Sequence, residues 1–83
     1  MKLTVIAIAD GLHPNEVLVE FETRDGTEEM IVDRRAIFDD AVEIGSPLGH
    51  EKGYTLVELP RETMRGAWRV WVPQGNVVED LAA

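Results

Sequence analysis

The chain has 83 residues, no cysteine, and 16 acidic against 8 basic side chains, which gives a net charge of −8. This length fits one domain with a thin hydrophobic core, and the missing thiols exclude a disulfide framework or a thiolate zinc site. The acidity opposes binding to nucleic-acid phosphates, and no stretch has the apolar length of a membrane span or a secretory leader, so we expect a cytoplasmic protein that contacts neither nucleic acid nor membrane.

The first predicted element is a strand over the sequence LTVIAIA, which ends at Asp10-Gly11. Its apolar residues fill both alternating faces, as is typical of a strand that is covered on both sides.

The sequence EVLVEFETRDGTEEMIVD predicts a β-hairpin, because Asp25-Gly26 is a favoured two-residue turn between alternating strands. Counting outward from that turn pairs Phe21 with Met30 and Val19 with Val32, so the apolar side chains share one face. The other face carries Leu18, Glu20, Glu22, Glu29 and Ile31, with Glu22 opposite Glu29, and is expected to be solvated.

In residues 33–44 the spacing of apolar residues changes from the alternation of a strand to that of a helix. Ile37, Ala41 and Ile44 recur at helical spacing, and Asp33 can cap the start. We expect a short helix that packs on the sheet. A competing interpretation continues the strand through Ile37 and Phe38, which also suit a sheet.

Residues 45–53 are glycine-rich and predict a loop. Two further strands follow in YTLVELP and AWRVWVP, and residues 76–83 either form a last helical turn, with Asn76 and Glu79 as a capping box, or fray. The fold class is therefore α+β and mainly β: one domain over residues 1–83, with four to five mostly antiparallel strands and one short helix.

The end of the chain, VWVPQGNVVED, resembles the closing strand and short turn of SH3 domains, so an SH3-like small β-barrel is the alternative fold. Ala9 and Gly11 stand where that family has groove-forming tyrosines. The resemblance therefore does not imply binding of proline-rich peptides.

Two tryptophans and two arginines lie close together near the end of the chain. Strand alternation places Trp68 with Val70 and Val72 on the core face and Trp71 with Arg69 on the other. Trp71 is then either covered by its own chain or exposed beside Arg69 as a binding anchor. We predict a partner-binding site of Trp71, Arg69 and Arg65.

No residue set predicts catalysis, a metal or a cofactor. His13 and His50 lack a ligand pair at metal-binding spacing, and Ser46, four residues before His50, lacks a nucleophile elbow. The function predicted first is a non-catalytic protein-interaction module or accessory subunit that binds a protein partner or self-associates. The alternatives are a small-molecule-binding or enzymatic protein that uses residues 45–53 and an acidic inhibitor that mimics nucleic acid.

Overall fold

The computed structural model describes residues 1–79, which form ten short strands and two 3-10 turns. The strands are β1 (Lys2–Thr4), β2 (Ile6–Asp10), β3 (Glu16–Thr23), β4 (Gly26–Asp33), β5 (Ile37–Phe38), β6 (Ala41–Glu43), β7 (Gly49–Glu51), β8 (Tyr54–Glu58), β9 (Arg69–Pro73) and β10 (Val77–Val78). The 3-10 turns are η1 (Arg34–Ala36) and η2 (Gln74–Asn76). The fold is mainly β, as predicted, and within residues 1–79 no helix is long and apolar enough to cross a bilayer.

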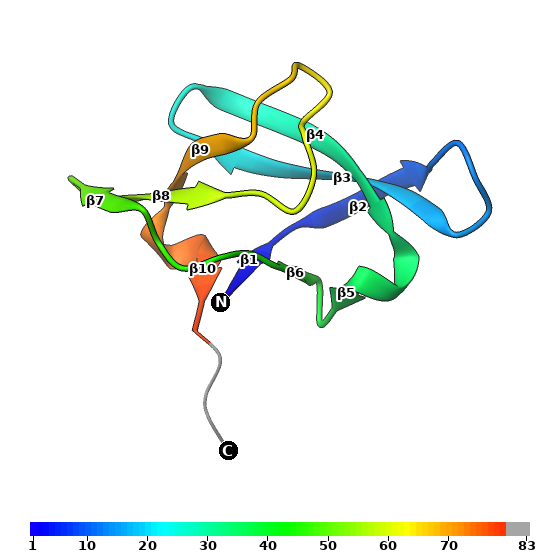
Figure 1. Cartoon of the computed structure of the whole chain (residues 1–83), viewed down its shortest axis with the longest axis horizontal. Coiled ribbons are helices and arrows are strands. Elements are labelled where there is room, and N and C mark those ends of the chain that lie inside the picture. The colour runs from blue at the N-terminus through cyan, green and yellow to red at the C-terminus, as the bar shows by residue number, and fades with distance from the viewer. Residues whose placement is uncertain (80–83) are drawn as a thin grey trace.

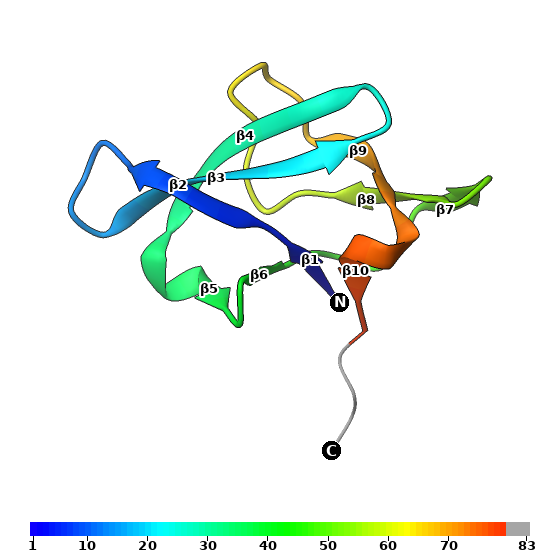
Figure 2. The same ribbon diagram turned by 180° about the vertical axis from the view of Figure 1, so that it is seen from behind.

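The strands form three antiparallel sheets, in the orders β10-β1-β6-β5, β2-β3-β4 and β7-β8-β9 (Figure 1). The view from behind shows β1 beside β10, so early and late segments of the chain share one sheet (Figure 2). The sheets do not close into a barrel in the described residues, so the SH3-like alternative is limited to the strand and 3-10 turn at Arg69–Asn76.

One hydrophobic core joins the three sheets. Alternate residues of each long strand point inward, because successive side chains of a strand lie on opposite faces. The buried apolar side chains are Leu3, Val5, Val17, Val19, Phe21, Met30, Val32, Val42, Ile44, Val57, Leu59, Val70 and Val72.

The predicted hairpin is present, with a register two residues from the predicted one. Val19 pairs with Met30, and Phe21 pairs with Glu28. The turn residues are Arg24 and Asp25, whose φ angles are not positive, whereas an Asp25-Gly26 turn of the predicted type needs positive φ at both. A shift of two residues keeps every side chain on its predicted face. Glu28, which shares the core face with Met30 and Val32, is buried opposite Phe21, and Glu20 rather than Glu22 lies opposite Glu29.

The predicted helix at residues 33–44 is wrong. Asp33 does cap a turn, because its carboxylate accepts the Arg35 N–H at 2.8 Å, but η1 is only three residues long. Asp39 and Asp40 then adopt φ angles of 52° and 58°, the geometry of a two-residue hairpin turn between β5 and β6. The competing strand interpretation is correct for Ile37–Phe38.

Three other predictions need correction. The first strand is interrupted at the buried Val5, and β2 beyond it is exposed along its whole length rather than covered on both sides. Part of the predicted loop at 45–53 forms β7, because Lys52 and Gly53 make a positive-φ turn into β8. Val77–Val78 is strand rather than a helical turn, and residues 80–83 of the predicted tail lie outside the described residues.

Candidate functional site

Trp68 is an exposed side chain, although strand alternation predicts it in the core. About half of it (51%) is accessible to solvent, and its Nε1–H donates to Glu62 Oε2 at 3.0 Å. The prediction is wrong because β9 begins at Arg69, so Trp68 belongs to the preceding loop and does not follow the alternation of the strand. Val70 and Val72, which lie within β9, are buried as predicted.

The segment that carries Trp68, residues 59–68, is a closed loop between β8 and β9. Leu59 N–H donates to Trp68 O at 2.8 Å, which extends the ladder of the two strands. Inside this closure Thr63 N–H donates to Ala67 O at 2.9 Å, and Gly66 takes a φ of +90° to turn the chain. These hydrogen bonds restrict the conformations of the loop in the isolated chain.

Thr63 and Met64 hold this loop in place. Thr63 is buried, and its hydroxyl oxygen accepts the Ala67 N–H at 3.0 Å. Met64 N–H donates to Glu29 O of β4 at 2.8 Å, so the loop lies against the edge of the β2-β3-β4 sheet. The Met64 side chain itself is 61% exposed.

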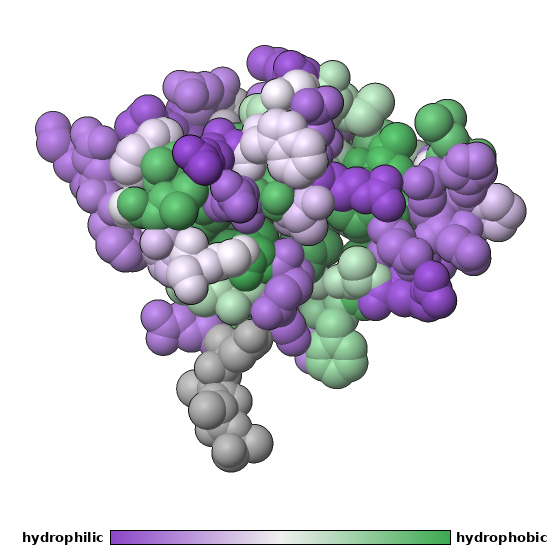
Figure 3. Space-filling model, in the orientation of Figure 1, coloured by the Kyte–Doolittle hydropathy of each residue, from purple (hydrophilic) through white to green (hydrophobic). Residues whose placement is uncertain are grey.

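Between this loop and β4 the surface is hollowed over a volume of about 560 Å³. The residues that line this depression, which we call the Trp68 hollow, are Ile31, Pro60, Arg61, Glu62, Thr63, Met64 and Trp68. In Figure 3 apolar side chains reach the surface beside β4, between hydrophilic ones. Aromatic, methionine and arginine side chains are the types enriched at protein interfaces.

The Trp68 hollow continues onto the face of the β2-β3-β4 sheet that points away from the core. Register aligns Ala9, Leu18 and Ile31 in one row across the three strands. Leu18 and Ile31 are half-buried, so this face, which was expected to be solvated, is less accessible to solvent than the sequence indicates. The row therefore extends the apolar surface from the loop toward the opposite edge of the sheet.

The neighbouring row of the same face consists of Ile6 and two glutamates. Glu20 lies directly opposite Glu29, and neither carboxylate has an ion-pair or hydrogen-bond partner among residues 1–79. Like charges in facing positions of a sheet repel one another. A cationic group placed between them would relieve that repulsion.

The predicted site of Trp71, Arg69 and Arg65 is only partly assembled. Trp71 and Arg69 line a smaller hollow of about 150 Å³ together with Thr23, Asp25, Glu28, Ala67 and Val70. Arg65 is not in that lining. Trp71 is half-buried, its ring packs over Gly49, and the guanidinium that stacks on it belongs to Arg24, 5.0 Å from the ring centre.

Both arginines of the predicted site pair with carboxylates of their own chain. Arg69 Nε lies 3.1 Å from Glu58 Oε2, and Arg65 Nε lies 3.7 Å from Glu28 Oε2. Glu28 is buried, and its other oxygen, Oε1, has no hydrogen-bond partner among the described residues. Binding of an acidic partner here would compete with existing ion pairs.

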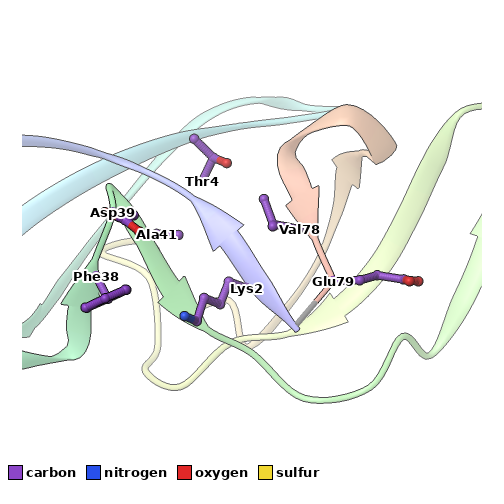
Figure 4. Close-up of a pocket in the computed structure, with 7 residues that line it drawn as sticks. All are labelled: Lys2, Thr4, Phe38, Asp39, Ala41, Val78 and Glu79. Atoms are coloured by element: carbon purple, nitrogen blue, oxygen red, sulfur yellow. The ribbon is translucent and has the colours of Figure 1, made fainter. Parts of the chain in front are cut away.

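Two further depressions lie on other parts of the surface. One, of about 320 Å³, crosses the outer side of the β10-β1-β6-β5 sheet, where Lys2 Nζ stands 4.9 Å from the centre of the Phe38 ring (Figure 4). The other, of about 160 Å³, includes His50, whose Nδ1 lies 3.3 Å from Thr55 Oγ1. Ser46 does not line it.

The acidic residues of the segment 16–43 do not form one exposed stripe. Glu20 and Glu29 lie on the outer sheet face, Glu28 points inward, and Asp39 occupies the β5–β6 turn. Within residues 1–79 no group of three or more histidine, aspartate or glutamate side chains is arranged to hold a metal ion.

Comparison with protein-family models, curated proteins and solved structures gives no match. The site is therefore defined by its geometry. Sequence reasoning missed Met64 and the position of Glu20 opposite Glu29. The signal that could have found Trp68 is the glycine at position 66, which indicates that the loop extends almost to Arg69.

Proposed function

We propose that this chain is a non-catalytic protein-interaction module and that it binds its partner through the Trp68 hollow. The observation that carries the proposal is a half-exposed tryptophan beside an exposed methionine on a loop fixed by hydrogen bonds. Aromatic anchors on preorganised elements lose little conformational entropy on binding, which favours them as hot spots.

The charge beside the hollow selects the chemistry of the partner. Glu20 and Glu29 face each other with no cationic partner within residues 1–79, next to the apolar row of Leu18 and Ile31. A partner surface with an apolar side chain for the hollow and a lysine or arginine for the carboxylates complements both features. The partner is therefore a protein with a basic and apolar surface.

The site predicted from the sequence, Trp71, Arg69 and Arg65, is a competing location for the same partner-binding function. The two locations differ in the charge of the partner surface that they would bind, because the arginines would contact an acidic surface. Substitutions in the two regions separate these locations.

The test compares immobilised parent protein with two variants in capture from the native host, followed by reconstitution with the purified captured protein. Trp68→Ala removes the anchor, and Phe38→Ala removes an aromatic side chain that is 66% exposed on another sheet. We expect the dissociation constant to rise at least about tenfold for Trp68→Ala and to stay unchanged for Phe38→Ala.

The contribution of the Glu20 and Glu29 carboxylates to binding is tested with the same purified partner. Glu20→Gln together with Glu29→Gln should weaken binding and reduce its dependence on salt. Binding that survives Trp68→Ala but is lost in Trp71→Ser would reject the Trp68 hollow and move the function to the Trp71 region.

A further inference from the structure

Strand β2 is an edge strand that is exposed on both of its faces. All five of its residues are exposed, and Ile6 and Ile8 are 61% and 41% accessible. The strand pairs with β3 on one side, and no strand of residues 1–79 pairs with its other side. The opposite edge of the same sheet, β4, is in contact with the 59–68 loop through Met64.

The outer edge of β2 lacks most features that prevent edge-to-edge association. Natural edge strands are commonly protected by lysine, proline, inward charges or bulges. Within β2 the one charged residue is Asp10 at its end, which Arg34 neutralises at a distance of 3.0 Å. A bulge between Ala7 and Ala9 is its only irregularity.

We propose that β2 pairs antiparallel with β2 of a second copy of this chain. Residues 6–9 are only isoleucine and alanine, so any antiparallel register within them avoids facing charges. A twofold axis perpendicular to the sheet generates this pairing from one self-complementary surface. The product is a continuous sheet in the order β4-β3-β2-β2-β3-β4, in which isoleucine side chains of the two edges become covered.

This pairing has a consequence for the outer sheet faces. A twofold axis perpendicular to the sheet leaves both outer faces on the same side of the combined sheet. The two Trp68 hollows would then face one direction, which allows bivalent contact with a partner that presents two sites. The pairing itself does not depend on Trp68.

Charge gives the pairing a distinctive dependence on salt. Each copy carries −8, so two copies repel each other, and salt weakens this repulsion by shortening the Debye length from about 10 Å at 0.1 M to about 3 Å at 1 M. Pairing through β2 should therefore become tighter with salt. Self-association through Trp71 and the arginines against an acidic hairpin would become weaker.

The experiment is sedimentation velocity of the parent and of matched lysine variants over a range of concentrations. Ile8→Lys places a charge on the edge, and Leu48→Lys makes the same change of net charge at a side chain that is 50% exposed outside β2. We expect a parent dimer that tightens with salt, a dissociation constant about tenfold higher in Ile8→Lys, and little change in Leu48→Lys. Ile6→Lys should repeat the effect of Ile8→Lys, with folding of each variant verified by circular dichroism.

Amide hydrogen exchange locates the interface independently. With rising protein concentration, exchange should slow for amides of β2 and remain unchanged for the short edge strands β5 and β7. A parent that stays monomeric up to about 1 mM, equal weakening by Ile8→Lys and Leu48→Lys, or concentration-dependent protection outside β2 would each overturn the pairing.

Discussion

Trp68 and Trp71 are three residues apart, and their surroundings differ in almost every respect. Trp68 lies on a loop, is half exposed and borders the largest depression described above. Trp71 lies in β9, is packed over Gly49 and carries the Arg24 guanidinium on its ring. The start of β9 at Arg69 separates them. A single strand boundary thus decides which tryptophan supports the fold and which is available to a partner.

The largest expected effect on stability is that of substituting Trp71, the tryptophan inside the strand. Trp71→Ala should lower the free energy of unfolding by about 2 kcal/mol, because a half-buried indole loses part of the contacts of a fully buried one. Trp68→Ala should lower it by less than about 1 kcal/mol, as for other exposed side chains. Urea denaturation of both variants measures the difference, and the reverse order would contradict the assignment of their roles.

The loop that carries Trp68 is tested through Thr63. Thr63→Val keeps the shape of the side chain but leaves Ala67 N–H without its acceptor, which should cost about 1–2 kcal/mol. Faster amide exchange at Ala67 and faster rotation of Trp68, seen by fluorescence anisotropy, should accompany this loss. Thr27→Val, at an exposed position of β4, is the control and should leave both measurements unchanged.

The region around Trp71 is tested through the buried carboxylate of Glu28. Glu28→Met should leave stability unchanged or raise it by up to about 1 kcal/mol, because an incompletely paired buried charge costs free energy that an apolar side chain avoids. Arg65→Met should instead destabilise, since it removes the ion-pair partner and leaves the charge. Strong destabilisation by Glu28→Met in thermal unfolding would show that the carboxylate is required there.

The smallest expected effect lies outside both tryptophan regions, at Asp33. Hydrogen bonds from the Arg35 side chain and backbone N–H lower the pKa of Asp33 from its usual 3.8 to about 2. A lowered folded-state pKa adds stability that is present above about pH 4 and is lost as the pH falls toward 2. An NMR titration should show this pKa in the parent and a return toward 3.8 in Arg35→Met. Trp71 fluorescence should not follow the Asp33 titration, and a shared transition would contradict the separation of Asp33 from the Trp71 region.

Alternation predicted the faces of the long strands, and the turn residues predicted the presence of the β3–β4 hairpin but not its register. The inward faces of β3 and β4 follow the predicted pattern, and β8 and β9 form within the two segments that were predicted to be strands. The helix at residues 33–44 was predicted because Ile37, Ala41 and Ile44 have helical spacing. Two aspartates with positive φ, a conformation that asparagine and aspartate tolerate best after glycine, formed a hairpin turn instead.

The candidate site was less predictable than the fold. Which tryptophan is exposed depends on whether β9 starts at Ala67 or Arg69, and strand boundaries are the least certain part of such predictions. The facing pair of Glu20 and Glu29 depends on a register set by the turn at Arg24 and Asp25. Both features come from the geometry of connections, which composition and periodicity describe poorly.

The position of β1 has a consequence for the order of folding. Leu3, which is fully buried, pairs with Val42 on one side and Val77 on the other, whereas Thr23 and Gly26 close their hairpin across two residues. Contacts between distant segments form slowly, because a large loop must close before they stabilise the chain. During synthesis Leu3 emerges before Val42 and long before Val77, so β1 gains one neighbouring strand midway through the chain and the other only near the end of the described residues. The local hairpins can form in that interval, and we expect completion of the β10-β1-β6 ladder to be the slow, final step.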